Sequence, residues 1–171
     1  MNEGSYSDTL VKVNTKTSKK VLRVVMIAVA VILLLIGLMI FLDNPGGFVI
    51  ILIIDVVLIY FLPSVKVEYE YVYVDGQIDF DRIIAGNSRK NMDRFDLDNV
   101  YAVAYEGSRI LDEYKNQKVK DYSSNNPDDT HYFAAINGAD KGDYLIKFTP
   151  DEKLVTEMKE KSPFRVHTKE A

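Results

Sequence analysis

The sequence has no cysteine among its 171 residues. Disulfide bridges, thiolate zinc sites, cysteine nucleophiles and a lipid anchor on cysteine are therefore excluded. The two histidines, His131 and His167, have no nucleophile beside them in a recognisable catalytic context. A glycine-rich phosphate loop is also lacking. We therefore expect no catalytic, cofactor-binding or metal-binding residue, and a protein that is not an enzyme.

Charge is nearly absent from two long stretches. Residues 24–42 contain no charged side chain, and residues 48–62 contain only Asp55. As a helix, the first stretch would cross the roughly 30 Å hydrocarbon core of a membrane. Five residues separate the stretches, which predicts a transmembrane hairpin over residues 21–65, with spans near 24–42 and 48–65. A cleaved signal peptide is disfavoured, because the first stretch is too long and no small-residue cleavage site follows it.

Lysine and arginine are missing from the loop between the spans, whereas Lys66 follows the second span. Four basic residues lie close before the first span: Lys16, Lys19, Lys20 and Arg23. The positive-inside rule therefore predicts a multi-pass protein of the cell membrane with both termini in the cytoplasm. These four residues also form a candidate membrane-surface basic cluster for anionic lipids. The orientation signal is the simpler interpretation, because four charges is the minimum for such a cluster.

Asp55 lies near the centre of the second span, where a charge costs about 2.5–3.5 kcal/mol. The thirteen Leu, Ile, Val and Phe residues of residues 48–62 offset this cost, so the helix still inserts. Residues 24–42 provide no polar side chain to pair with Asp55. The carboxyl must be protonated, draw in water, or meet a group from another chain. The last alternative predicts an intramembrane contact with a second copy or a partner helix, through a face that the i, i+3, i+4 spacing defines: Ile51, Leu52, Asp55, Leu58 and Ile59.

After Lys66 the apolar period changes to two. Val67–Val74 predicts a strand, Asp75-Gly76 a tight turn, and Gln77–Ile84 the returning strand. Further strands are expected near 89–95, 100–105, 131–136 and 143–148. Thr149–Glu152 predicts a helix start, with a threonine N-cap and a capping box, and the apolar face of this helix is Leu154, Val155 and Met158.

These elements predict one cytoplasmic β-rich domain over residues 66–161. A loose tail of residues 1–20 precedes the hairpin, and a polar tail of residues 162–171 follows the domain. Residues 66–171 carry 16 Lys and Arg against 21 Asp and Glu, which argues against nucleic acid as a partner. The predicted hairpin instead indicates the lipid bilayer as a partner.

Two features have both a structural and a functional interpretation. Tyr69, Tyr71 and Tyr73 share one strand face and could stack on a ligand, but half-buried sheet faces favour tyrosine, which supports core packing. Asp128, Asp129 and His131 carry ligand atoms for a metal. Their spacing fits no known metal site, so a solvated turn is the simpler interpretation.

Three stretches carry a resemblance: KVEYEYVYVDG directly after the hairpin, FDLDNV before the fourth strand and KDYSSNNP in a long loop. With them the chain resembles an uncharacterised domain-of-unknown-function family of small bacterial two-helix membrane proteins. The order of antiparallel strands and one final helix is also similar to a pleckstrin-homology-like barrel. The resemblance implies a membrane α-hairpin plus an α+β soluble domain, with an antiparallel, barrel-like β-sheet and one C-terminal helix. It implies no activity.

Three function classes remain open. A core without a catalytic constellation favours a non-enzymatic, membrane-tethered binding or scaffolding module. A small regulatory subunit of a larger membrane complex, assembled through Asp55, is the first alternative. An enzyme whose site no motif reveals is the second.

Overall fold

The computed structural model describes residues 5–15, 17–64, 66–138 and 142–169. It divides the chain into two compact units, one formed by residues 15–65 and the other by residues 1–14 together with 66–171. We call them the helical unit and the β unit. The helical unit is thus an insertion between two parts of the β unit.

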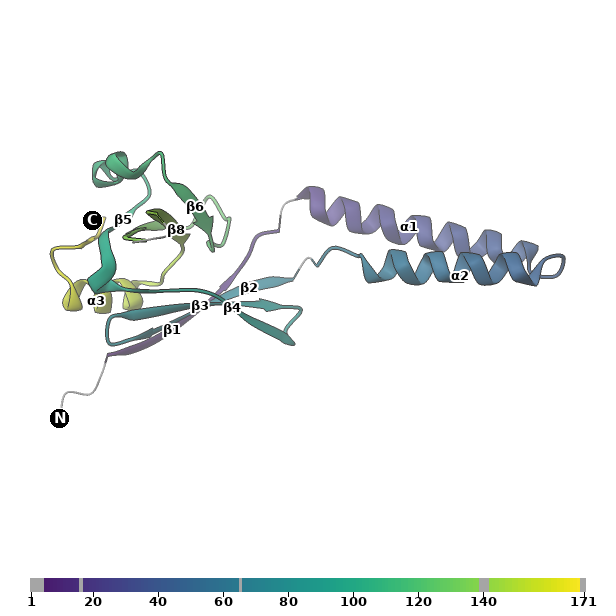
Figure 1. Cartoon of the computed structure of the whole chain (residues 1–171), viewed down its shortest axis with the longest axis horizontal. Helices are drawn as coiled ribbons and strands as arrows, with labels where there is room; N and C mark the ends of the chain where they lie inside the picture. Colours follow the sequence, from purple (N-terminus) through teal and green to yellow (C-terminus); the bar gives the residue numbers. More distant parts are fainter. Residues whose placement is uncertain (1–4, 16, 65, 139–141, 170–171) are drawn as a thin grey trace. The chain divides into compact units, whose positions relative to one another are not determined.

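The helical unit is a hairpin of α1 (Thr17–Ile40) and α2 (Pro45–Tyr60), which lie side by side (Figure 1). At its closed end, the Asn44 side chain accepts a hydrogen bond from the Gly47 amide at 2.9 Å, and Pro45 occupies the first turn of α2. A Cβ on Gly37 would lie 3.0 Å from the Phe48 ring, so glycine permits the close approach of the two helices there.

The helix boundaries differ from the predicted spans. α1 begins at Thr17 rather than near residue 24, and α2 ends at Tyr60 rather than near 65. Lysine and arginine are good helix formers, so the polar segment before the apolar stretch continues the helix instead of ending it. Among the described residues, α1 is the one helix long and apolar enough to cross a membrane, whereas α2 has 16 residues.

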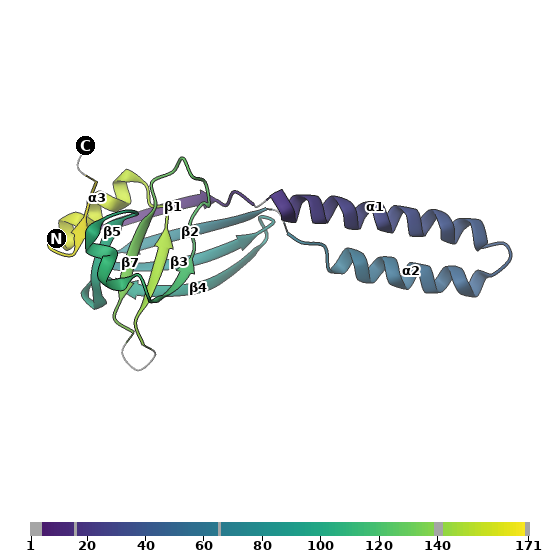
Figure 2. The same cartoon turned by 90° about the horizontal axis from the view of Figure 1, so that it is seen from above.

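The β unit contains two sheets. Four antiparallel strands form the first sheet in the order β1-β2-β3-β4: β1 (Tyr6–Lys12), β2 (Val67–Val74), β3 (Gln77–Ile84) and β4 (Ser88–Asp96) (Figure 2). The second sheet has the order β6-β8-β7-β5-β9, with strands β5 (Val100–Tyr105), β6 (Lys118–Asp121), β7 (Tyr132–Ile136), β8 (Tyr144–Phe148) and β9 (Val166–His167). The other elements are two 3-10 turns, η1 (Leu97–Asn99) and η2 (Arg109–Tyr114), and the helix α3 (Glu152–Lys161).

The predicted antiparallel, barrel-like sheet is confirmed only in part, because the strands form two sheets that do not close into a barrel. At one gap, the edge strands β4 and β6 are joined by a side-chain ion pair between Asp93 and Lys120. At the other, α3 contacts both β1 and β9. The second sheet also contains parallel pairs, β5 with β9 and β6 with β8, so the fold is not purely antiparallel.

The prediction of a loose tail over residues 1–20 is wrong for Tyr6–Lys12 and for the residues from Thr17 onward, which begin α1. Tyr6–Lys12 forms β1, which pairs with β2 from Tyr6 opposite Val74 to Lys12 opposite Glu68. Its inward positions are Ser7, Thr9 and Val11, all of them buried. Two of these three side chains carry hydroxyls, so the hydrophobic alternation that would predict a strand is absent. Pairing with β2 decides the conformation instead.

The C-terminal segment gives a similar correction. Val166 and His167 form β9 alongside β5, so residues 162–171 are not only a tail. Val166 is fully buried in the core. A strand of two residues is too short to show periodicity in the sequence, and only its pairing with β5 identifies it as a strand.

The C-terminal helix is confirmed, but its cap differs. Asp151, not Thr149, caps α3, and its carboxylate accepts a hydrogen bond from the Leu154 amide at 2.8 Å. The apolar face is as predicted, because Leu154 and Met158 are fully buried and Val155 packs against the same core.

Aromatic rings fill the space between the sheets. Tyr71 packs on Phe80 and Phe148, with ring centroids 5.2 and 5.9 Å away. The Tyr71 hydroxyl donates to the Tyr122 carbonyl at 2.6 Å and accepts from the Thr149 amide at 3.2 Å. Tyr71 and Tyr73 are fully buried. Core packing is therefore confirmed as the role of this tyrosine face.

The pairing of β1 with β2 predicts a large difference between two adjacent residues. Val11→Asn places an amide in the core, where an unpaired polar group costs about 1–3 kcal/mol. Leu10→Asn, on the exposed face of the same strand, should change the free energy of unfolding by less than about 0.5 kcal/mol. Pulse proteolysis of the full chain in urea measures both values. Equal, small effects would show that Tyr6–Lys12 is not part of the fold.

Candidate functional site

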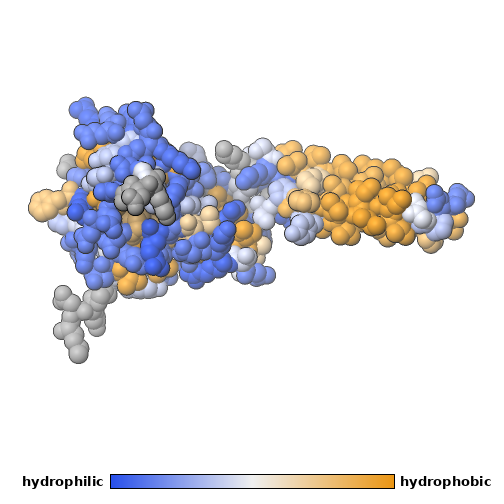
Figure 3. Space-filling model, in the orientation of Figure 1, coloured by the Kyte–Doolittle hydropathy of each residue, from blue (hydrophilic) through white to orange (hydrophobic). Residues whose placement is uncertain are grey.

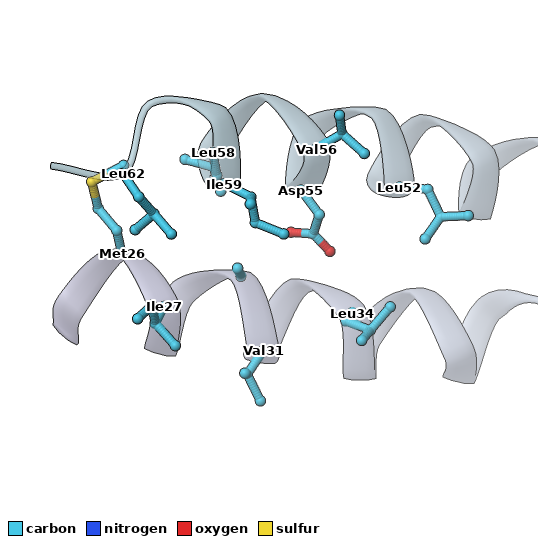
Figure 4. Close-up of a pocket in the computed structure, with 11 residues that line it drawn as sticks. Met26, Ile27, Val31, Leu34, Leu52, Asp55, Val56, Leu58, Ile59 and Leu62 are labelled. Carbon is cyan, nitrogen blue, oxygen red and sulfur yellow. The ribbon is translucent and has the colours of Figure 1, made fainter. Parts of the chain in front are cut away.

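The helical unit holds a pocket of about 540 Å³ between its two helices (Figure 4). We call it the hairpin groove. Its α1 wall includes Ile27, Ala30, Val31 and Leu34, and its α2 wall includes Leu52, Asp55 and Ile59. Every side chain that lines it is apolar except Asp55. The groove is therefore an apolar site with a single carboxyl.

Asp55 points across the groove toward α1 (Figure 4). Only 7% of its surface is exposed, although its neighbours Val56 and Ile59 on the rim are more than half exposed. Within the described residues, its Oδ1 atom is buried and has no hydrogen-bond partner. A buried polar atom normally has a partner, because leaving it without one costs about 1–3 kcal/mol. Asp55 thus has a hydrogen-bonding capacity that no described residue uses.

The face predicted for contact with another chain lies mainly against α1. Leu52, Asp55, Leu58 and Ile59 all line the hairpin groove. Ile51 instead lies near Gly37, at 3.3 Å from a Cβ built there. The i, i+3, i+4 spacing thus identified residues that share one side of α2, while their contact with another chain stays a prediction. Which helix covers this face is a property of the hairpin, which spacing cannot show.

The candidate basic cluster is only partly described, because Lys16 lies outside the described residues. Lys19, Lys20 and Arg23 lie in the first two turns of α1, and the two lysines are exposed. Arg23 donates from Nη1 to the Pro63 carbonyl at 3.4 Å. Arg23 thus links the start of α1 to the segment after α2, at the open end of the hairpin.

A polar cluster in the β unit was not predicted. His131 Nδ1 lies 2.8 Å from Thr149 Oγ1, and the same hydroxyl accepts from the Ser124 amide at 3.0 Å. These residues precede β7, follow β8 and follow β6, so no short motif could have connected them. A hydroxyl beside an imidazole is the pairing that activates nucleophiles. Here Thr149 also satisfies a backbone amide, and the cluster ties three segments together.

The three residues weighed as metal ligands, Asp128, Asp129 and His131, line one hollow of the β unit without forming a ligand cluster among the described residues. Asp129 accepts a hydrogen bond from the Asn126 side chain at 2.9 Å, while His131 is 93% buried and turned to Thr149. In the described ranges, no three His, Cys, Asp or Glu side chains are grouped as a metal site.

A second cluster lies at the gap between β4 and β6. The Lys120 ammonium pairs with Asp93 and lies 3.7 Å from the centroid of the Tyr144 ring. The Tyr122 hydroxyl donates to the same carboxylate at 3.4 Å. Burial raises the pKa of Tyr122 to about 12, and the charge of Asp93 adds to this rise. The charged groups of this cluster therefore join the two sheets.

The surface of the β unit has a separate hollow of about 310 Å³ beside η2. Leu111, Val119, Phe133 and Leu145 make its apolar wall. An ion pair between Lys115 and Asp112, 2.9 Å apart, lies at its edge. The hollow is built from segments far apart in the sequence, so it was not predicted.

A family model described as "Bacterial PH-like domain (DUF6106)" matches residues 3–168. No curated protein and no solved structure matches the chain. The match spans both units, and the family carries no assigned activity.

The Tyr122 environment predicts a stability change at alkaline pH. An unfolded tyrosine titrates near pH 10, whereas folded Tyr122 holds its proton until about pH 12. Its contribution to stability is therefore complete below about pH 10 and is lost as the pH rises toward about 12. Tyr122→Phe should make the fall in urea midpoint over this range shallower, as followed by circular dichroism of the full chain in detergent.

The matched control is Tyr6→Phe, because Tyr6 is exposed on the outer face of β1. Its slope should equal that of the wild type. Equal slopes for wild type and Tyr122→Phe would contradict the assigned role of Tyr122.

Proposed function

We propose a membrane-tethered binding or scaffolding role for this chain, which belongs to the bacterial PH-like domain family DUF6106. The helical unit is a two-span anchor in the cell membrane, and both chain ends and the β unit are cytoplasmic. The β unit is a non-enzymatic module that binds partners at the membrane.

The apolar surface of the helical unit carries this proposal. Figure 3 shows apolar residues over most of the visible surface of the helical unit, with polar residues toward its two ends. Most described side chains of α1 are exposed, and Gly37 is its one buried residue. Exposed apolar area is unfavourable in water by about 25 cal/mol per Å². An apolar patch that continues along two helices marks an interaction or membrane surface. Hydrocarbon removes that penalty.

The lengths of the helices are compatible with spanning. The 24 residues of α1 rise about 36 Å, and the 16 of α2 rise about 24 Å. Phe61 and Leu62 extend the apolar stretch beyond α2. A short span is accommodated by local thinning of the bilayer at a modest cost. The close packing of Gly37 on Phe48 supports a retained hairpin rather than a cleaved leader.

The contacts in the β unit support binding over catalysis. Its best nucleophile-like hydroxyl, Thr149, satisfies a backbone amide, and its partly buried ion pair, Asp93 with Lys120, joins two sheet edges. The hollow beside η2 offers an apolar wall with a charged edge, which is a surface suited to recognition.

One observation favours a second role for the same protein. The unpaired Oδ1 of Asp55 supports a regulatory subunit whose hairpin assembles with other membrane helices. In this role the hairpin is an assembly element as well as an anchor.

The absence of cysteine makes the topology directly testable. Asp43→Cys, between the helices, should react with a membrane-impermeant maleimide in intact cells. Phe164→Cys, at a side chain 92% exposed, should react only after lysis. The opposite pattern would reverse the orientation, and protection of both sites before lysis would contradict a spanning hairpin.

Cross-linking in native membranes followed by mass spectrometry tests the binding role. Val11→Asn destabilises the β unit, and Asp55→Leu removes the groove carboxyl. Partners of the β unit should be lost from Val11→Asn but kept by Asp55→Leu, while partners of the hairpin should show the reverse. Leu10→Asn is the control for Val11→Asn. If Val11→Asn captures the wild-type partners in full yield, the β unit is not the binding module, and the same result for Asp55→Leu excludes assembly through Asp55.

A further inference from the structure

The hairpin groove combines three properties that rarely occur together. Its walls are apolar, its one carboxyl is 93% buried, and an oxygen of that carboxyl has no partner among the described residues. Figure 4 shows the carboxyl aimed into the space between the helices. A polar atom so placed is suited to a group that enters the groove from outside.

The helical unit itself cannot supply this group. Opposite Asp55, the α1 wall consists of Ile27, Ala30, Val31 and Leu34. Arg23 precedes Ala30 by seven residues, which is about 10 Å along a helix, and its guanidinium donates to the Pro63 carbonyl. No residue from 24 to 62 is basic. Within the described residues the helical unit thus offers Asp55 no charged donor, and a cationic partner would have to come from another molecule.

Charge complementarity indicates which kind of molecule would occupy the hairpin groove. A second copy of the chain would bring only another carboxyl to the depth of Asp55, because its basic residues flank the spans. Two carboxylates repel each other in a medium of low dielectric constant. A cationic side chain instead forms a charge-assisted hydrogen bond, the strongest pairing available to a carboxylate. Ionisable residues inside membranes commonly pair in this way.

We infer that the hairpin groove binds a transmembrane helix of another protein that carries one lysine or arginine near the middle of the bilayer, paired with Asp55. This inference rests on the proposed membrane hairpin. It names the chemistry of the partner and excludes a second copy of the chain.

The dimensions of the groove fit such a side chain. Its volume of about 540 Å³ exceeds that of one side chain, and its rim is open at Val31, Val56 and Ile59, which are more than half exposed. The aliphatic stem of a lysine or arginine packs along apolar walls while its charged end reaches a polar group. Asp55 is the one such group on the lining.

Model peptides test the inference without knowledge of the natural partner. The full-length chain is reconstituted in phosphatidylcholine vesicles with labelled leucine-alanine helices of about 20 residues. One peptide has a central lysine and the other a central leucine. Energy transfer should show the wild-type chain binding the lysine peptide about five- to thirty-fold more tightly, the range expected for a polar contact between model helices.

Variants locate the preference. Asp55→Glu keeps the charge and should keep the preference for lysine. Asp55→Asn keeps the shape and most hydrogen-bonding capacity but removes the charge, so the preference should fall to near unity. Ile53→Asn is the matched control, because Ile53 is exposed and outside the groove lining. It should behave as the wild type.

The outcomes separate this inference from the proposed function. Flotation after alkaline extraction first reports whether the chain inserts, and failure to insert overturns both. If it inserts but binds the two peptides equally, or if Asp55→Asn keeps the lysine preference, only the inference falls. Asp55-dependent energy transfer between two labelled copies of the chain would also overturn it, in favour of self-association.

Discussion

The pairing of β1 with β2 is the constraint on which the architecture depends. These strands are neighbours in the first sheet, yet the whole helical unit lies between them in the sequence. The Val13 amide donates to the Val67 carbonyl at 3.0 Å, so the chain leaves and rejoins the β unit at adjacent positions. A helical hairpin satisfies this closure, because its two open ends are also close together. The long insertion therefore costs the sheet only the slowly growing entropy of loop closure.

Several polar side chains in the core of the β unit have structural roles. Tyr71 uses its ring in the core and its hydroxyl to hold the Tyr122 carbonyl and the Thr149 amide. Asp93 and Lys120 bridge two sheet edges that lack a backbone ladder. Each of these side chains is satisfied by the fold. The function of the β unit is thus better sought in its surface than in these buried groups.

Asp55 is the contrast. It is buried in an apolar groove, and its Oδ1 has no partner within the described part of the chain. An apolar residue of similar size would pack in the same place at lower cost. A carboxyl at this position is physically reasonable if the helical unit is completed by another molecule.

The sequence by itself determined the features that depend on local composition and periodicity. The two apolar helices, the Val67–Val74 strand with its Asp75-Gly76 turn, and the buried face of α3 follow from the run length, the period of two and the spacing of Leu154 and Met158. Asp55 is conspicuous for the same reason, as one charge in an apolar stretch. These sequence patterns are reliable because each of them reflects the environment along the whole element, whether hydrocarbon, water or protein core.

Only the tertiary structure decided the rest, because the remaining features depend on neighbours distant in the chain. β1 has Ser7 and Thr9 at inward positions and becomes a strand through β2, and β9 exists only beside β5. Thr149 is of a residue type common at N-caps, but its hydroxyl is hydrogen-bonded to the Ser124 amide and to His131. Asp151 caps α3 instead. The direction in which Asp55 points is set by the packing of α2 on α1. Local sequence cannot encode such choices, since the competing partner that decides each of them lies elsewhere in the chain.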